Sequence, residues 1–192
     1  MSTATHSHGE GHGAHYPRLY INRLGFWLFL FSESMLFAGL LASRFYLRGL
    51  SRPEELSQSL GLGITVILLV SSLTAYLSET AISHGDRPAF LRYTLYTMVL
   101  GAIFLGGVAF EWTAAFQHFP PSSPFGTVFF AMTGMHAFHV LSGIFLLGLV
   151  YYNGRRGAYG PEDAWPPEAV VKYWHFVDVV WVFFYAALYL VA

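Results

Sequence analysis

Five long apolar stretches constrain the fold of this chain more than any other feature of its sequence. Each is close to the roughly 20 residues that a helix needs to cross the hydrocarbon core of a bilayer. In order, they occupy approximately residues Leu24–Tyr46, Leu60–Ile82, Tyr93–Ala115, Phe125–Tyr151 and Val170–Val191. The connecting segments are rich in proline, glycine, serine or charge, as turns usually are. The sequence therefore predicts an all-α membrane protein, a bundle of five transmembrane helices.

The small share of charged residues supports a lipid-facing surface. Only 11% of the 192 residues are Asp, Glu, Lys or Arg, whereas soluble domains usually carry about 25%. The formal net charge of −1 gives no basic surface, so no nucleic-acid partner is expected. The chain has no cysteine, which excludes disulfides, thiolate-bound clusters and cysteine nucleophiles.

The distribution of Lys and Arg predicts how the bundle is oriented, because short cytoplasmic loops carry an excess of these residues. With a cytoplasmic N-terminus and a C-terminus on the outer side, the cytoplasmic ends hold Arg18, Arg23, Arg87, Arg92, Arg155, Arg156 and Lys172. The outer ends hold only Arg44, Arg48 and Arg52. We also expect two regions, a polar histidine-bearing tail (residues 1–22) and the five-helix domain (residues 23–192).

Ionisable residues occur inside every apolar stretch. A charge at mid-bilayer costs about 2.5–3.5 kcal/mol on insertion scales, so such groups normally face the bundle interior and a partner. The candidates for buried polar contacts are Glu33, Glu79, Glu111, His136, His139, His175 and Asp178. Because His175 and Asp178 share one helical face, we expect them to hydrogen-bond and to anchor the last helix to its neighbours.

Three interpretations of these residues compete. A haem could be held by His136 or His139 opposed to His175 from another helix. The acids and histidines could form a proton relay, with Glu33 as the best candidate, although no span is broken as in transporters. A structural role is favoured over both. In the tail, a weak copper or zinc site is a further possibility, formed by His6, His8, His12 and His15.

Three segments resemble, in order, the subunit III family of the haem–copper oxidases. "LFSESMLFAGLLASRFY" places Glu33 on the family's buried carboxylate, and "FGTVFFAMTGMHAFHVLSGIFLL" has two histidines in the family's spacing. "YWHFVDVVWVFFY" is similar to the signature of its last helix, and Glu111 falls on another acidic position. The likeness runs from about Leu24 to Leu190. Two further helices of the seven-helix members are missing ahead of it, so the chain resembles the five-helix bacterial form.

The resemblance implies an accessory subunit without haem, copper or catalytic residues of its own. In this family subunit I reduces oxygen with its haem and copper, and subunit III packs against it in a complex that includes subunit II. The implied roles are assembly, stability and proton uptake of subunit I, in the cell membrane of a bacterium during aerobic electron transport. The family's lipid-holding arginine corresponds to Arg155 or Arg156, so a bound phospholipid is expected there.

The electron donor stays open at this point. Cytochrome c oxidase is favoured, but the equivalent subunit of a quinol oxidase and the accessory protein of a nitric oxide reductase share the expected fold. A proton-coupled transporter and a b-type cytochrome are more distant alternatives from other classes. The transporter would function without haem-bearing partners, whereas the cytochrome would keep a haem when isolated.

Overall fold

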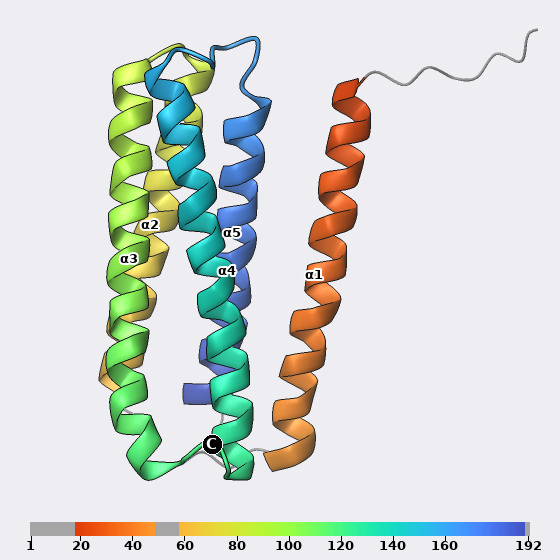
Figure 1. Ribbon diagram of the computed structural model, residues 1–192, viewed down its shortest axis with the longest axis vertical. Coiled ribbons are helices and arrows are strands. Elements are labelled where there is room, and N and C mark those ends of the chain that lie inside the picture. Colours follow the sequence, from red (N-terminus) through yellow and green to blue (C-terminus); the bar gives the residue numbers. More distant parts are fainter. Residues whose placement is uncertain (1–17, 49–57, 191–192) are drawn as a thin grey trace, which may run out of the picture.

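The computed structural model describes residues 18–48 and 58–190 and contains five long antiparallel helices (Figure 1). All five are long and apolar enough to cross a membrane, which confirms the all-α, five-helix prediction. The histidines of the tail lie outside the described residues. The helices are α1 (Arg18–Arg48), α2 (Gln58–Ser83), α3 (Arg87–His118), α4 (Pro124–Arg155) and α5 (Trp165–Tyr185), which the short π-helix η1 (Ala186–Leu190) continues.

The helices extend beyond the apolar stretches from which they were predicted. α1 begins at Arg18, inside the segment 1–22 that the sequence assigned to the tail, and α5 begins at Trp165 rather than near Val170. Polar and aromatic residues suit the interfacial zone of a bilayer, so a helix can continue there without apolar side chains. Hydropathy therefore locates the part of each helix in hydrocarbon and misses its interfacial turns.

Side-chain caps and prolines fix the starts of α3 and α4. Asp86 accepts a hydrogen bond from the backbone N–H of Ala89 at 3.0 Å, and Ser123 accepts one from Gly126 at 3.0 Å. A proline stands in the first turn of both helices, where its missing N–H has no cost. Capped, tight connections bring α2, α3 and α4 side by side.

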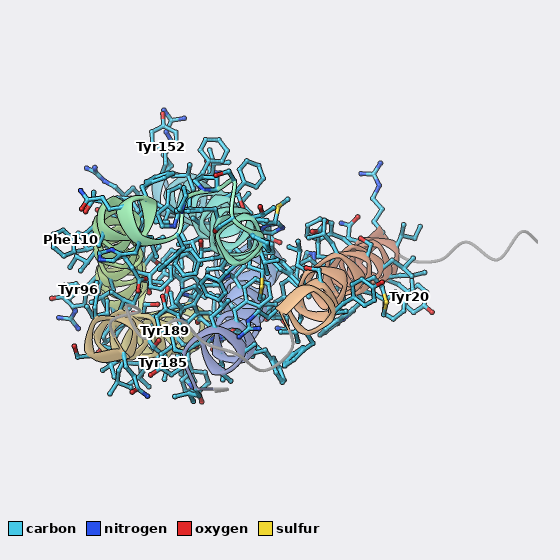
Figure 2. The ribbon with its side chains drawn as sticks, turned by 90° about the horizontal axis from the view of Figure 1, so that it is seen from below. Tyr20, Tyr96, Phe110, Tyr152, Tyr185 and Tyr189 are labelled. Carbon is cyan, nitrogen blue, oxygen red and sulfur yellow. The ribbon has the colours of Figure 1, made fainter. Side chains whose placement is uncertain are left out.

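Helices α2 to α5 form a four-helix bundle, and α1 lies beside it against α4 and α5 (Figures 1 and 2). The contact of α1 includes Phe37, whose ring meets the Phe184 ring at 5.6 Å between centroids. The buried Arg44 guanidinium lies 5.6 Å from the centre of the Phe125 ring on α4. Of the five spans, α1 buries the smallest share of its residues and α5 the largest.

The antiparallel order gathers the basic residues at one end of the bundle. The start of α1, the turn between α2 and α3, and the connection between α4 and α5 all lie at that end (Figure 1). These segments and the helix turns next to them carry the seven Lys and Arg residues that were predicted to be cytoplasmic. Arg44 and Arg48 lie toward the other end of α1, and Arg52 lies outside the described residues. The charge asymmetry on which the orientation rests is thus present in three dimensions.

The Trp174 indole joins α5 to three other helices at the centre of the bundle. Its Nε1–H donates to the Ser71 hydroxyl of α2 at 3.0 Å, and the side chain is fully buried. A Cβ atom on Gly101 of α3 would lie 2.5 Å from the indole, and one on Gly143 of α4 would lie 2.8 Å from it. Only glycine at these two positions leaves room for the ring.

We expect Gly101→Ala and Gly143→Ala to destabilise the protein by about 1–3 kcal/mol, the usual cost of overpacking a filled core. The measurement is the thermal unfolding midpoint in mild detergent. Gly106→Ala on α3 is the matched control, because a Cβ there meets no atom within 4 Å. Equal midpoints for all three variants would show that the indole does not occupy this space.

Candidate functional site

A polar contact joins α1 to α4 through Glu33 and His139. The Glu33 Oε2 atom lies 3.0 Å from His139 Nε2, and His139 Nδ1 lies 2.8 Å from the carbonyl oxygen of Met135. A carbonyl can only accept, so Nδ1 carries a proton. Nε2 must then either accept from a neutral Glu33 or donate, as imidazolium, to a carboxylate. In both states the pair holds one shared proton and is neutral overall.

Two hydroxyl groups adjoin this pair. The Ser142 hydroxyl donates to the backbone carbonyl of His139 at 2.8 Å and lies 2.7 Å from the Tyr173 hydroxyl of α5. Together with Glu33 and His139 they line a cavity of about 340 Å³. Its remaining walls are the side chains of Phe29, Phe138, Phe145 and Leu146.

A ladder of polar contacts joins α5 to α2. At the basic end Lys172 Nζ lies 3.3 Å from Glu79 Oε1 and 2.5 Å from Glu168 Oε1. Deeper in the membrane, His175 Nδ1 lies 2.7 Å from the Ser72 hydroxyl. Further along, the indole N–H groups of Trp174 and Trp181 donate to Ser71 and Thr65, each at 3.0 Å. The ladder ties one side of α5 to α2 over much of its length.

The expected hydrogen bond between His175 and Asp178 is absent, so that prediction is wrong. His175 turns toward Ser72 of α2, and neither carboxyl oxygen of Asp178 has a hydrogen-bond partner among the described residues. The Ser72 hydroxyl lies near the Asp178 carboxyl, but the two groups do not have the geometry of a hydrogen bond. Helical spacing placed both residues on one face correctly, but a hydroxyl on the neighbouring helix competes for the imidazole.

The remaining two candidates also lie inside the bundle. His136 is fully buried against aromatic rings, 4.8 Å from Trp181 and 5.7 Å from Phe104 between centroids. Glu111 Oε2 accepts a hydrogen bond of 2.5 Å from the Tyr189 hydroxyl, which ties α3 to η1 at the far end of the bundle. These contacts connect the last turns of the chain to α3 and α4.

The three histidines of the haem interpretation face different neighbours. His139 faces α1, His136 packs against aromatic rings, and His175 faces α2. The structure therefore does not bring His175 into opposition with either of the others. Within residues 18–48 and 58–190, no group of three His, Cys, Asp or Glu side chains is placed to hold a metal ion.

Arg155 and Arg156 are exposed at the end of α4. The Arg156 guanidinium lies over the Tyr152 ring, 4.4 Å from its centre. The Arg87 side chain donates to the backbone carbonyls of Gly154 and Arg155. These bonds hold the end of α4 against the start of α3. Both arginine side chains face outward from the basic end of the bundle, which suits contact with a lipid headgroup.

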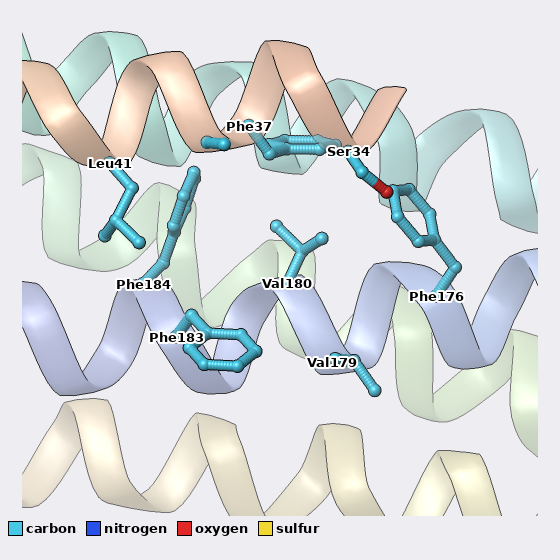
Figure 3. Close-up of a pocket in the computed structure, with 9 residues that line it drawn as sticks. Ser34, Phe37, Leu41, Phe176, Val179, Val180, Phe183 and Phe184 are labelled. Carbon is cyan, nitrogen blue, oxygen red and sulfur yellow. The ribbon is translucent and has the colours of Figure 1, made fainter. Parts of the chain in front are cut away.

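An apolar groove of about 330 Å³ separates α1 from α5 (Figure 3). Phe37 and Leu41 of α1 and Val180, Phe183 and Phe184 of α5 line it, and Figure 3 shows Leu41 and Phe184 pointing into the space between the two helices. Ser34 is the one polar residue in its lining. The groove can accommodate hydrocarbon but offers little to a polar ligand.

The sequence analysis missed the hydroxyl partners of the site. It singled out ionisable residues, whereas Ser71, Ser72, Thr65, Ser142 and Tyr173 complete the contacts between helices. A weak signal exists, because serine and threonine in membrane helices commonly hydrogen-bond across helix interfaces. It could not say which of the many hydroxyls do so.

The fold and these contacts define a polytopic membrane protein whose intramembrane polar groups are used mainly between helices. The family model of cytochrome c oxidase subunit III matches residues 5–192. The chain therefore belongs to the cytochrome c oxidase subunit III family, whose members are accessory subunits of haem–copper oxidases. The predicted resemblance is confirmed.

Individual relatives agree with this assignment. The chain is 37% identical over 174 residues to a cytochrome c oxidase subunit 3 of Corynebacterium diphtheriae, which covers 85% of each chain. It is 34% identical over 173 residues to that of Thermostichus vulcanus, with 87% of this chain and 86% of the relative covered. The cytochrome c oxidase subunit 3 of Synechocystis is 32% identical over 195 residues, with 97% and 82% covered.

We expect Glu33→Gln to preserve stability, because the amide group can still donate a hydrogen bond to His139 Nε2. His139→Phe removes the contact and should cost about 0.6–1.7 kcal/mol, the range measured for hydrogen bonds between membrane helices. The measurement is again the thermal midpoint in detergent. Thr113→Ala is a control, because this exposed hydroxyl bonds only within α3. A Glu33→Gln variant as unstable as His139→Phe would show that the contact requires a carboxyl group.

Proposed function

We propose that this chain is a non-catalytic subunit of a bacterial cytochrome c oxidase that packs against subunit I within the membrane. It supports assembly and stability of the complex and keeps proton uptake into subunit I fast. The observation that carries the proposal is family membership over nearly the whole chain, combined with intramembrane polar groups that contact neighbouring helices. Haem and copper belong to the partner subunits, including subunit II, and this chain supplies no catalytic residue.

The intramembrane polar residues have a structural role in this proposal. Glu33 and His139 join α1 to α4, and Glu111 joins α3 to η1. His175 and Glu79 take part in the contacts that join α5 to α2. By holding α1 and η1 to the bundle, these contacts preserve the shape that subunit I meets. A charge or hydrogen-bonding group in hydrocarbon is costly without a partner, so each bridge also opposes separation of the helices. His136 and Asp178 are the other two candidate residues, and both side chains are buried inside the bundle.

The proposed location is the bacterial cell membrane, with the N-terminus in the cytoplasm and the C-terminus on the outer side. The basic residues gathered at one end of the bundle support this orientation. Exposed Arg155 and Arg156 then lie at the level of cytoplasmic headgroups. Either can bind the phosphate of a phospholipid, for which the guanidinium group is well suited.

A strain that lacks this chain tests the proposal. We expect the remaining oxidase to keep its haem bands but to consume oxygen more slowly per haem. Its activity should then decline within fewer turnovers, because proton delivery to subunit I is slower without the accessory subunit. The measurement is oxygen consumption over time by the purified complex, with haem quantified from the reduced-minus-oxidised spectrum.

Restoring the wild-type chain should restore the sustained rate, which serves as the control. Loss of the haem bands in proportion to the missing chain would contradict the proposal and favour a chain that carries a haem itself. Unchanged turnover in the absence of the chain would contradict the accessory role.

A further inference from the structure

The cavity beside the Glu33–His139 pair lies far from the ends of the two long helices that form it, so we infer that it lies near the middle of the membrane. Glu33 stands half-way along α1 and His139 half-way along α4. The cavity of about 340 Å³ opens between these two helices at that depth. α1 and α4 therefore present a recess with a polar floor at the level where a bilayer contains only hydrocarbon.

Part of this polar floor is still available for bonding. Glu33 keeps 20% of its side chain exposed, although its Oε2 atom is paired with His139. Among the described residues, no hydrogen bond reaches its Oε1 atom. The Tyr173 and Ser142 hydroxyls, which direct their protons to each other or to the His139 carbonyl, also retain acceptor capacity. The recess thus contains hydrogen-bond acceptors that a hydrogen-bond donor from outside this chain can reach.

Aromatic side chains form the rim. Phe138 and Phe145 are 65% and 66% exposed and stand one heptad apart on α4, with Ser142 between them. Phe29 of α1 stands on the opposite side. Two large side chains separated by a small one leave a hole of the kind into which a side chain of an adjacent helix inserts.

A phospholipid cannot donate a hydrogen bond to the acceptors in this recess. Its headgroup lies about 15 Å away, half the thickness of the hydrocarbon core, and its acyl chains carry no hydrogen-bond donor. Between membrane helices, by contrast, polar side chains hydrogen-bond at this depth. The groove between α1 and α5 is almost entirely apolar, so its occupant does not need a hydrogen-bond donor.

We propose that the recess between α1 and α4 is the docking site for a transmembrane helix of another subunit of the oxidase, which inserts a hydrogen-bond-donating side chain toward Glu33 Oε1. The inference rests on the proposed function, because it needs a complex in the membrane. It adds to that function by naming the face that meets the partner. This face includes α1, which has the smallest buried share of residues among the five spans.

The absence of native cysteine makes this face directly testable. A single cysteine is introduced by Phe145→Cys at the rim, or by Phe110→Cys as the control. Phe110 is 68% exposed on α3, on the side of the bundle away from α1 (Figure 2). Each complex is purified with its haem-bearing subunits, placed in lipid nanodiscs and treated with a lipid-soluble maleimide. Labelling after denaturation in detergent gives the total available thiol.

We expect Phe145→Cys to react at least about tenfold more slowly than Phe110→Cys in the intact complex, a ratio equivalent to about 1.4 kcal/mol. Equal rates would overturn the docking site while leaving the proposed function intact, since the complex has been isolated. Failure of both variants and the wild-type chain to co-purify with haem-bearing subunits would overturn the proposed function and this inference together.

A photo-crosslinking amino acid at position 145 identifies the occupant. The result expected is an adduct with another oxidase subunit, absent when the same amino acid replaces Phe110. An adduct with phospholipid alone at position 145 would overturn the docking site, because it would show that lipid fills the recess.

Discussion

Polar groups inside a hydrocarbon layer are costly without partners, and the arrangement of this molecule depends on that constraint. Most of them bond to a neighbouring helix, whereas among the described residues the Asp178 carboxyl and the His136 ring nitrogens have no hydrogen-bond partner. α5 illustrates the constraint most fully. Its lysine, histidine and two tryptophans meet an acid and three hydroxyls of α2, while Tyr173 meets Ser142 of α4. At the far end Tyr189 bonds Glu111 of α3. Since helices in lipid gain no hydrophobic free energy from associating with each other, these contacts and close packing around Trp174 hold the bundle together.

The same constraint explains the contrast between α1 and the rest. α1 contacts the bundle through the Glu33–His139 pair, the Phe37 ring and the buried Arg44. Most of its large side chains, such as Trp27 and Phe31, face outward. An accessory subunit needs one surface to hold itself together and another to meet its complex, and by our inference α1 serves both. Its intramembrane carboxyl is accordingly shared between an internal histidine and, by our inference, an external donor.

Much of the fold could be predicted from the sequence, because bilayer thickness fixes the length of an apolar span independently of tertiary contacts. The early starts of α1 at Arg18 and α5 at Trp165 could not, since interfacial turns have no apolar signature. Burial of His136 and Asp178 inside the bundle follows from the cost of exposing them to lipid. Their partners do not follow, because periodicity describes one helix and a hydrogen bond between helices depends on two. The His175–Asp178 pair failed for that reason, with Ser72 as the unforeseen competitor.

Interhelical polar contacts within this chain hold its helices together, and we propose that it carries no haem of its own while it belongs to a complex that does. The most direct measurement is a reduced-minus-oxidised visible spectrum of the tagged chain purified in mild detergent, repeated after the chain has been stripped from its partners. We expect haem–copper oxidase bands in the first preparation, and their retention by the remaining subunits in the second. Haem retained by the lone chain would contradict the proposal and return His136, His139 and His175 to consideration as ligands.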